Sequence, residues 1–584
     1  MDGNLALAEK FNDVSMFRTC EQCGCCSSAC PITGVNGFNV RQIVRHIELD
    51  LVDEIAETPY PWYCTTCGRC EGVCPNGIAI LDVIRPLRSL SPEAFVPEGP
   101  APCTNACPAG IDVPGYVRLI AQGRADEACQ LILERVPFPG ILGRVCTHPC
   151  EEACRRGDVN DAISICALKR FAADRAGSFP EGGQDVAGDT GRKVAVIGAG
   201  PAGLTAAFYL RRQGHQVTIF EASPKPGGMM RYGIPSYRLP EDVLEKEIDR
   251  ILTLGIELQT GKTLGEDFDL DQLKGEGYDA VYMALGLQKS RRIELEGAEL
   301  DGVFWGIDFL RDVHSGDAVT LKEKVLVVGG GNVAVDVALT ALRVGARDVT
   351  LACLEGREEM PANPWEIEMV LEEGIKVMPS WGPHRITGEN GRVAGIELVR
   401  CSAVFDDDGN FCPAFDDTRE MVEADQVILA IGQTADLSCL ESMGPFKVEK
   451  DLLVVDPGTR ETDFPGIFAG GDVVTGPGTI VQAISAGREA ASAMDRFLGG
   501  DGNILECRMP NAECRIKERE YDGKREKGFA DLGRTESPTL PLSERHQGFP
   551  EVERCLSDDR AIMEAKRCLQ CDLELALAGR GRGE

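Results

Sequence analysis

Two runs of four cysteines near the start of the chain constrain its fold more than any other feature. Both runs follow one spacing and each is followed by a proline: Cys20, Cys23, Cys26 and Cys30, then Cys64, Cys67, Cys70 and Cys74. Three cysteines at this spacing wrap one corner of a 4Fe-4S cube, and the fourth cysteine of a paired run ligates the neighbouring cube. The sequence therefore predicts two clusters with crossed ligands, in which Cys74 completes the first set and Cys30 completes the second.

Zinc and disulfides are the alternatives for these cysteines. Short Cys-x-x-Cys units also bind tetrahedral zinc, although two runs that each end in Cys-Pro are typical of iron-sulfur clusters. The sequence shows no signal peptide, so we expect the protein in the cytoplasm, where thiols stay reduced. Cys25 lies inside the first run without fitting its spacing, and we expect it to be a buried free thiol.

Composition disfavours several classes of function. The 584 residues suffice for about three to five domains. The net charge of −32 disfavours binding to nucleic acid, and most of that charge is expected to be a solvated surface. No apolar run reaches the length of about 18 residues that a membrane span needs, so we expect no direct membrane insertion. The six histidines show no spacing typical of acid–base hydrolysis.

The first segment is expected to be a cluster module of its own. Linkers rich in proline and glycine at 91–102 and 177–191 set it and the next segment apart. Between the two cysteine runs, residues 40–55 carry apolar side chains at helical spacing. The phrases CEQCGCCSSACP and YCTTCGRCEGVCP, with that helical spacer, resemble the two-cluster iron-sulfur subunit of heterodisulfide reductase over about residues 15–90. The resemblance implies an electron-carrying module and leaves its partner open.

A second cysteine-rich block spans residues 103–176. The phrases CTNACPAGIDVPGYVRLIAQGR and GRVCTHPCEEAC resemble the N-terminal domain of the glutamate synthase small subunit, which dihydropyrimidine dehydrogenase shares and which binds two more 4Fe-4S clusters. The family's RCLxCD phrase is missing before the block and appears near the C-terminus, with Cys568 and Cys571. The resemblance implies that the tail returns to complete a cluster with Cys103 and Cys154. A separate zinc knuckle or free thiols are the alternatives for the tail pair.

The second cluster of this block lacks an obvious fourth ligand. The resemblance assigns it Cys107, Cys146 and Cys150 and aligns Lys169 with a ligand that is not a cysteine in the family. Because a protonated lysine is a poor ligand for iron, Cys166, about one helical turn earlier, is the better candidate.

Residues 194–221 carry a dinucleotide-binding fingerprint. An apolar strand leads into Gly198, Gly200 and Gly203 and an apolar helix, and a second strand ends at Glu221. The glycines allow a tight turn and close approach to a pyrophosphate, the helix N-terminus faces the phosphates, and the carboxylate accepts hydrogen bonds from the ribose. With strand, helix and acid in register, the pattern predicts a nucleotide site.

A second fingerprint lies at 325–351, with Gly329 and Gly331 in its turn. The phrases FPGIFAGGD and PGGMMRYGIPSYRLP extend the resemblance to the glutamate synthase small subunit over about residues 103–500. It implies FAD in the first site and NAD(P)H in the second, which is inserted into the FAD domain. Beyond the fingerprints, the resemblance assigns six residues to the cofactors: Gly227, Gly228, Asn332, Gly471, Asp472 and Thr479.

The residues after the second strand of this fingerprint bear on the choice of nicotinamide. Relatives that use NADP(H) carry two arginines where this chain has Leu354 and Glu355. A carboxylate pairs with free ribose hydroxyls and repels a 2′-phosphate, so we expect NAD(H) to be preferred over NADP(H). Arg357 keeps NADP(H) open.

The expected fold class is α/β, a Rossmann-like flavoprotein with two dinucleotide domains, preceded by α-helical iron-sulfur domains. The expected segments are a two-cluster module at 1–95, a helical two-cluster domain at 103–176, an FAD domain at 192–315 and 431–500, a nicotinamide domain at 323–430 and a ligand-returning tail at 501–584.

The expected function is an NADH-linked electron-transfer subunit with FAD and about four 4Fe-4S clusters. No side chain is assigned as a catalytic acid, base or nucleophile, because the cofactors supply the chemistry. Expected partners are redox proteins: a heterodisulfide reductase-like subunit, a tungsten or molybdenum oxidoreductase, or a ferredoxin. The alternatives are an NADPH oxidoreductase like the glutamate synthase small subunit and a non-enzymatic electron-wire adaptor. The direction of flow, the terminal acceptor and electron bifurcation stay open.

Overall fold

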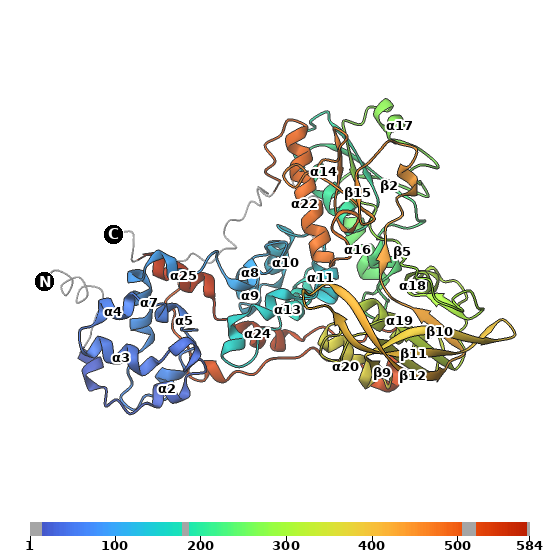
Figure 1. Ribbon diagram of the computed structural model, residues 1–584. Helices are drawn as coiled ribbons and strands as arrows, with labels where there is room; N and C mark the ends of the chain where they lie inside the picture. The colour runs from blue at the N-terminus through green and yellow to red at the C-terminus, as the bar shows by residue number, and fades with distance from the viewer. Residues whose placement is uncertain (1–14, 178–185, 505–520, 581–584) are drawn as a thin grey trace.

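The N-terminal module is a small helical unit built around the two cysteine runs (Figure 1). The computed structural model describes residues 15–177, 186–504 and 521–580 of the chain. The main helices of this module are α2 (Cys25–Ala29), α3 (Val40–Glu48), α4 (Val52–Ala56), α5 (Tyr60–Tyr63), α6 (Arg69–Gly72) and α7 (Leu81–Leu90). Gly24 and Gly68 begin the short helices α2 and α6 with φ of 82° and 75°, so the two runs fold alike.

The spacer between the runs is two helices rather than the single helix expected over 40–55. Its apolar face is buried at Val40, Ile43, Val44 and Ile47, as the spacing predicted. The chain turns after α3, however, where Asp50 adopts a φ of 56°, and α4 starts in a new direction.

The cysteine-rich helical domain lies between the N-terminal module and the two dinucleotide domains (Figure 1). Its helices are α8 (Pro102–Asn105), α9 (Val113–Ala121), α10 (Ala125–Leu133), α11 (Pro139–Val145), α12 (Pro149–Glu152) and α13 (Ile165–Arg175). Glu247 of helix α16 (Glu241–Leu252) accepts hydrogen bonds from the N–H groups of Gly140 and Ile141, at 2.7 and 3.0 Å. These bonds satisfy donors at the free N-terminus of α11, and so they fix this domain on the flavoprotein.

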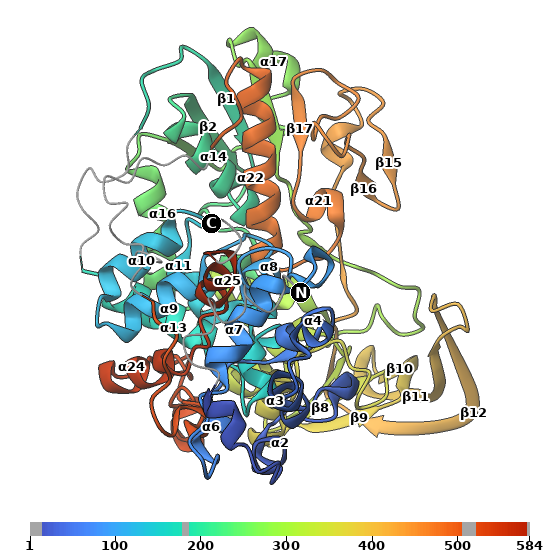
Figure 2. The same cartoon turned by 90° about the vertical axis from the view of Figure 1, so that its left-hand side faces the viewer.

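A five-stranded parallel sheet forms the first dinucleotide domain. Its strand order is β17-β4-β1-β2-β3, with bounds Ile467–Ala469, Ala280–Met283, Lys193–Ile197, Gln216–Glu221 and Glu257–Thr260. Helices α14 (Pro201–Arg212) and α22 (Ile480–Phe497) pack together beside the sheet (Figure 2). They approach closely because Gly487 has no side chain: a Cβ atom there would lie 2.3 Å from the carbonyl oxygen of Ala202.

The second dinucleotide domain holds another parallel sheet, in the order β6-β13-β7-β8-β9. Its strands are Val303–Trp305, Gln426–Leu429, Lys324–Val328, Asp348–Cys353 and Lys376–Pro379, covered by α18 (Gly306–Ser315), α19 (Asn332–Val344) and α20 (Pro364–Glu372). An antiparallel sheet of β10 (Trp381–Glu389), β11 (Arg392–Phe405) and β12 (Phe411–Glu423) projects from it (Figure 1).

The expected boundary between these domains at 315 is wrong. Strand β6 and helix α18 pair and pack with the second sheet, so the crossing lies earlier. The chain crosses between the domains through the two-stranded pair β5 (Lys289–Ser290) and β14 (Gln433–Thr434). A short strand such as β6 carries little sequence signal, which explains the displaced boundary.

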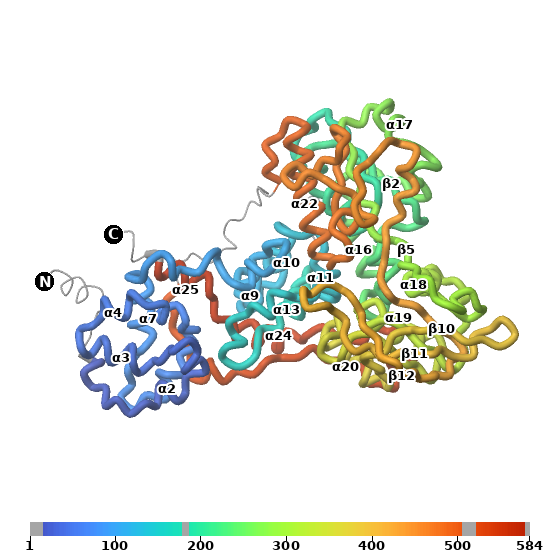
Figure 3. Tube along the Cα trace, viewed as in Figure 1, coloured from blue at the N-terminus to red at the C-terminus, as the bar shows by residue number. Residues whose placement is uncertain are grey.

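The C-terminal tail runs back across the molecule (Figure 3). From the N-terminal module it reaches the second dinucleotide domain, where Arg545 contacts Glu372 at 3.1 Å. It then returns through α24 (Asp558–Lys566) on the helical domain and ends in α25 (Cys571–Arg580) against α7. Among the described residues, none of the helices combines the length and the apolar character that crossing a membrane requires.

Candidate cluster and nucleotide sites

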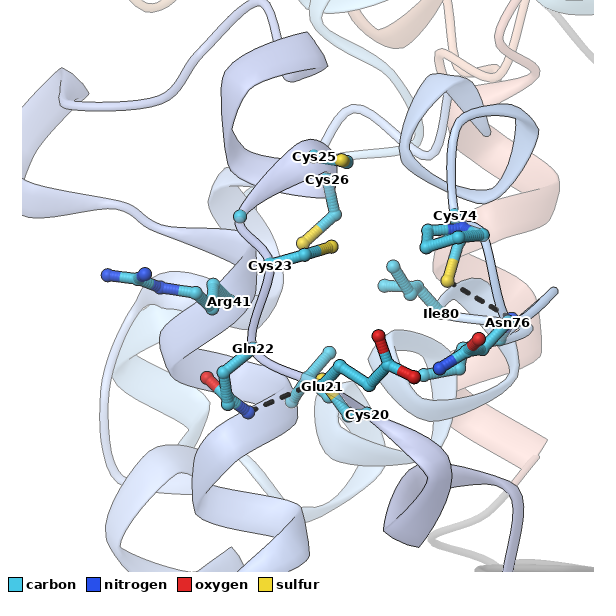
Figure 4. Close-up of a pocket in the computed structure, with 14 residues that line it drawn as sticks. Cys20, Glu21, Gln22, Cys23, Cys25, Cys26, Arg41, Cys74, Asn76 and Ile80 are labelled. Atoms are coloured by element: carbon cyan, nitrogen blue, oxygen red, sulfur yellow. Dashed lines mark hydrogen bonds between the residues drawn. The ribbon is translucent and has the colours of Figure 1, made fainter.

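The first cysteine site lies between the two runs of the N-terminal module (Figure 4). A cavity of about 380 Å³ is lined by Cys20, Cys23 and Cys26 from the first run and by Cys74 from the second. The structure therefore brings together the crossed set that the spacing predicts. Cys25 lies on the same cavity and is exposed, so the expectation that it is buried is wrong. No residue of the short helix α2 is buried, which the spacing alone did not reveal.

The second cysteine site is the complement of the first. Cys30 of the first run joins Cys64, Cys67 and Cys70 around a cavity of about 340 Å³. Burial raises the pKa of the Cys64 thiol to about 11, and the guanidinium of Arg88 opposes that rise. A buried thiol of this kind is deprotonated most readily when a metal binds it, because the metal supplies the missing positive charge.

The third site joins the helical domain to the tail. The half-buried Cys103 thiol interacts electrostatically with Cys568 and Cys571 of the tail and with Cys154, which is the set that the resemblance implies. Burial raises the pKa of Cys568 to about 12, and the nearby thiols of Cys571 and Cys154 add to the rise. Four clustered thiols that repel one another as thiolates need a cation or a metal cluster among them.

The fourth site has three cysteines and a lysine. Cys107, Cys146, Cys150 and Lys169 line a cavity of about 290 Å³. Lys169 is buried, and its ammonium group donates to the carbonyl oxygen of Leu142 at 3.4 Å. Burial lowers the pKa of Lys169, but the surrounding thiols outweigh this and raise it above its usual range. The structure thus places Lys169 on the cavity wall.

Cys166, the expected fourth ligand, lies beside this cavity and not on its wall. Its Sγ faces the carbonyl oxygens of Leu142 and Gly143, at 3.4 and 3.5 Å. A ligand role for Cys166 requires its side chain to turn away from those carbonyls and stays a prediction.

One backbone turn recurs at all four sites, two residues after a cysteine. Gln22, Thr66, His148 and Gln570 have φ values of 54°, 54°, 41° and 54°, in the left-handed region. At three of the sites the N–H of the turn residue donates to the cysteine Sγ two residues earlier, at 3.4 Å in each case: Cys64, Cys146 and Cys568. This conformation costs of order 1–3 kcal/mol in a residue other than glycine. N–H groups aimed at sulfur stabilise thiolate ligands of iron-sulfur clusters. The same bond at the tail pair therefore supports a ligand role for it.

The geometry fits iron-sulfur cubes better than single ions. In the described ranges 15–177, 186–504 and 521–580, no three His, Cys, Asp or Glu side chains are arranged to hold one metal ion. The cysteines of the first, second and fourth sites instead surround cavities, and a cube fills such a space while a lone zinc ion needs its ligands about 2.3 Å from one point.

The turn after β1 forms the first nucleotide site. A side chain at Gly198 would meet the carbonyl oxygen of Ala284 at 2.4 Å, and one at Gly203 would meet the carbonyl oxygen of Gly198 at 1.9 Å. Only glycine therefore fits at these two positions. Gly200, in contrast, faces free space, since its nearest neighbour would lie 3.9 Å from an added side chain. The free space above the N-terminus of α14 fits the pyrophosphate of a dinucleotide.

Glu221 sits where a ribose acceptor is needed. It ends β2, and its carboxylate accepts hydrogen bonds from the N–H groups of Ala199 and Ser223, both at 2.7 Å. The side chain is buried at the end of β2, and each carboxylate oxygen keeps a further lone pair that can accept a hydrogen bond.

The other residues assigned to the flavin converge on the same region. Gly228 lies against Gly200, and a side chain at Gly471 would meet Ala202 at 2.9 Å. Burial raises the pKa of Asp472, at the start of α21 (Asp472–Thr475), to about 6, and a hydrogen bond from a backbone N–H opposes the rise. Thr479 caps α22 by accepting from the N–H of Gln482 at 3.4 Å. Gly227 precedes Gly228 with a φ of 131°.

The second nucleotide site has the same form. A side chain at Gly329 would meet the carbonyl oxygen of Ala430 at 2.3 Å, while Gly331 has open space in front of it. Asn332 begins α19 and accepts a hydrogen bond from the N–H of Asn363 at 3.1 Å. Open space at a glycine turn before a helix again fits a pyrophosphate.

Glu355 lies against this turn. Its Oε2 would be 2.5 Å from a side chain added at Gly330, so the carboxylate faces the place where the adenosine ribose is expected. Arg357, two residues further along the chain, is exposed.

Several residues that hold these sites in place escaped the sequence analysis. Arg238 donates to both carboxylate oxygens of Asp336 at 2.8 Å and also contacts Glu366, which locks the two dinucleotide domains together. The sequence could have pointed to Arg238, because it belongs to the phrase PSYRLP, part of the resemblance to the glutamate synthase small subunit. Arg155 joins the helical domain to the N-terminal module, and nothing in the sequence pointed to it.

Comparison with known proteins agrees with this geometry. Residues 192–487 match the family model of pyridine nucleotide-disulphide oxidoreductases. The chain belongs to that family. Residues 99–179 match the 4Fe-4S cluster domain II of dihydropyrimidine dehydrogenase, and residues 16–78 match a 4Fe-4S dicluster domain.

Three relatives are similar to this chain over most of its length. The beta subunit of an NADP(+)-dependent formate dehydrogenase from Moorella thermoacetica is 40% identical over 85% of this chain and 74% of its own length. The beta subunit of an NADPH-Fe(3+) oxidoreductase from Geobacter sulfurreducens is 34% identical over 90% and 84%. The small chain of glutamate synthase (NADPH) from Escherichia coli is 33% identical over 68% and 88%.

These findings confirm the expected fold class and the expected enzyme class. The protein is a flavin- and iron-sulfur-dependent NAD(P)H oxidoreductase of the electron-transfer type, in which a glutamate synthase small-chain-like flavoprotein is fused to an N-terminal two-cluster module.

Proposed function

We propose that the chain is the nicotinamide-linked electron-transfer subunit of a larger redox complex and that its partner docks at the N-terminal module. The observation that carries this proposal is an unbroken series of cysteine sites. The series starts beside the flavin helix α22, whose Val481 lines the fourth site, and ends at the exposed Cys23 of the first site.

Contacts between neighbouring sites support the order of the series. Cys150 of the fourth site lies close enough to Cys103 of the third to raise the pKa of that thiol, beyond the larger effects of burial and of the third site's own cysteines. The third and second sites meet where Cys571, Leu569 and Cys67 pack in one apolar cluster. The second and first sites share Ile80 on their walls. Each site thus has one neighbour toward the flavin and one toward the surface of the module.

The chain's own residues hold and orient the cofactors. Glu221 and the first glycine turn would hold FAD, Glu355 and the second turn would hold the nicotinamide nucleotide, and the four cysteine sites would hold four 4Fe-4S clusters. When bound, FAD exchanges a hydride with the nicotinamide and single electrons with iron-sulfur clusters, in either direction. Arg238 keeps the two nucleotide domains at a fixed angle through Asp336 and Glu366.

We further propose that NAD(H) is the preferred nucleotide. The carboxylate of Glu355 at the glycine turn supports this choice, since it attracts ribose hydroxyls and repels a 2′-phosphate. The names of the relatives from Moorella thermoacetica and Geobacter sulfurreducens instead mention NADP(+) and NADPH. NADP(H) is therefore the second candidate, and a direct comparison of the two nucleotides decides between them.

The partner is proposed to be a catalytic subunit. The same two relatives are beta subunits of a formate dehydrogenase and of an Fe(3+) oxidoreductase, which supports a multi-subunit assembly. A metal-dependent oxidoreductase, a heterodisulfide reductase-like subunit or a ferredoxin fits the exposed end of the cysteine series.

Stopped-flow mixing with NADH tests the proposal. The anaerobically reconstituted chain should show bleaching of the flavin band, followed by the spectral changes of reduced clusters. NADPH should bleach the flavin more slowly. A flavin that neither nucleotide bleaches would leave the chain as an electron-wire adaptor and refute the proposed entry site.

A further inference from the structure

The second and third cysteine sites meet at a junction rich in arginine. The junction is a cavity of about 430 Å³ between the N-terminal module, the linker at 97–102 and the tail. Arg88, Arg155 and Cys571 line it together with Glu574. Two guanidinium groups therefore lie beside a cysteine of the third site and next to the peptide of the second.

Arg155 makes the most direct connection across this junction. It follows Cys154 of the third site in the chain, and its guanidinium donates to the carbonyl oxygens of Tyr63 and Cys64, at 2.7 and 3.2 Å. Cys64 belongs to the second site. One side chain thus spans from the residue next to one proposed ligand to the peptide of another.

Two neighbouring arginines, Arg88 and Arg525, also donate to backbone carbonyls at this junction. Arg88 donates to the same Cys64 carbonyl at 2.7 Å and to Pro61 at 2.9 Å, but both acceptors belong to its own module. Arg525 bonds Thr66 at 3.1 Å and Leu569 at 2.7 Å through backbone carbonyls, and it belongs to the tail. Arg155 differs because it extends from the helical domain and reaches a proposed ligand of the N-terminal module.

The charge of Arg155 also acts on the third site. Its guanidinium and Cys571 line the same cavity, so one positive charge lies beside a proposed ligand of the third site. A positive charge that stabilises a thiolate also stabilises the more negative, reduced state of a cluster bound there, because both carry extra negative charge.

We propose that Arg155 is a positioning residue that ties the tail-completed cysteine site to the second site of the N-terminal module and places one positive charge between them. It fixes the separation of the two sites and raises the reduction potentials of the clusters that they hold. This inference rests on the proposed function, since it requires clusters at both sites.

The test is a potentiometric titration of the full-length reconstituted chain, followed by electron paramagnetic resonance. Arg155→Gln should lower the midpoint potentials of two of the four clusters by about a tenfold change in the one-electron equilibrium, which equals about 59 mV. Arg155→Lys keeps the charge and should recover most of the shift. Arg175→Gln is the matched control, because Arg175 also joins the helical domain to the tail, through Asp558 at 2.7 Å, and bonds no proposed ligand.

The outcomes separate this inference from the proposed function. Unchanged potentials in Arg155→Gln, or the same shift in Arg175→Gln, would overturn the role of Arg155 while leaving the proposed function intact. A wild-type chain that lacks clusters at the second or third site would overturn both. If Arg155→Gln loses iron, the same titration of Arg155→Lys tests the proposal instead. Potentials close to wild type would support it, and potentials lowered by the full shift of about 59 mV would refute it.

Discussion

Glu574 anchors the C-terminal helix to the N-terminal module, and its replacement by glutamine should release that contact. The carboxylate is buried, with 4% of the side chain exposed, and lies 3.0 Å from Arg85, 3.1 Å from Arg525 and 3.6 Å from Arg88. Tyr521 donates to it at 2.7 Å. Glu574→Gln keeps the shape but leaves several buried guanidinium groups without their common counter-charge.

The size of the effect follows from the burial. Removing one member of a buried ion pair costs about 3–5 kcal/mol, because the remaining charge stays desolvated. Each 1.4 kcal/mol is about tenfold in an equilibrium, so the local opening of α25 should become roughly 100-fold or more favourable. Hydrogen exchange of the amides in α7 and α25 measures this opening directly.

A matched control separates burial from charge. Asp531→Asn also removes a carboxylate partner of an arginine, Arg69 at 3.1 Å, but 74% of the Asp531 side chain is exposed. Exposed pairs contribute about 0–1 kcal/mol, so exchange in this variant should stay close to wild type. Equal protection in Glu574→Gln and Asp531→Asn would refute the reasoning.

The anchor should also respond to acid. Burial alone raises the pKa of Glu574, but Arg85, Arg525 and Arg88 outweigh it and hold the pKa below its usual range. A carboxyl group with a lowered folded pKa stabilises the fold above its unfolded pKa of about 4.3, and that contribution is lost as the pH falls through the folded value. Protection of α25 should therefore fall below about pH 4 in wild type, whereas Glu574→Gln should lack this pH-dependent step.

Three further predictions follow from the sites. Metal analysis of the anaerobically reconstituted chain should find about sixteen irons, four per cluster; eight or fewer, or stoichiometric zinc, would contradict four clusters. Glu355→Arg should weaken NADH and improve NADPH as reductants of the flavin in stopped-flow mixing, because it replaces a ribose acceptor by a phosphate donor; a wild type that already prefers NADPH would show the choice of nucleotide to be wrong. The double variant Cys568→Ser/Cys571→Ser should lose one cluster, about four irons, and keep its flavin; an unchanged iron count would show that the tail completes no cluster.

Much of the fold and of the candidate sites could be predicted from local sequence patterns. The turns of the dinucleotide sites follow from glycines that no other residue can replace, as at Gly203, and the helix α22 begins beside the expected Thr479. The two crossed cysteine sets of the N-terminal module also lie where the spacing placed them. Such features depend on short-range sterics and ligand spacing, which a sequence states directly.

The features that the sequence did not reveal depend on long-range packing. The break between α3 and α4 arises from one residue in the left-handed region, Asp50, and β6 joins its sheet through pairing with the distant β13. Lys169 lines the fourth cavity, whereas the Sγ of Cys166 on the same helix faces carbonyl oxygens of α11. Arg155 gains its importance only when the helical domain meets the N-terminal module.

The central claim is that electrons entering at the nucleotide site reach the first cysteine site, at the exposed end of the series. Low-temperature electron paramagnetic resonance of samples frozen after anaerobic mixing with NADH tests it most directly, in wild type and in Cys20→Ser/Cys23→Ser. We predict that the flavin bleaches at the same rate in both proteins and that the signal of one reduced cluster is missing from the variant. Identical cluster signals in the two proteins, or no reduced cluster in wild type after the flavin has bleached, would contradict the account.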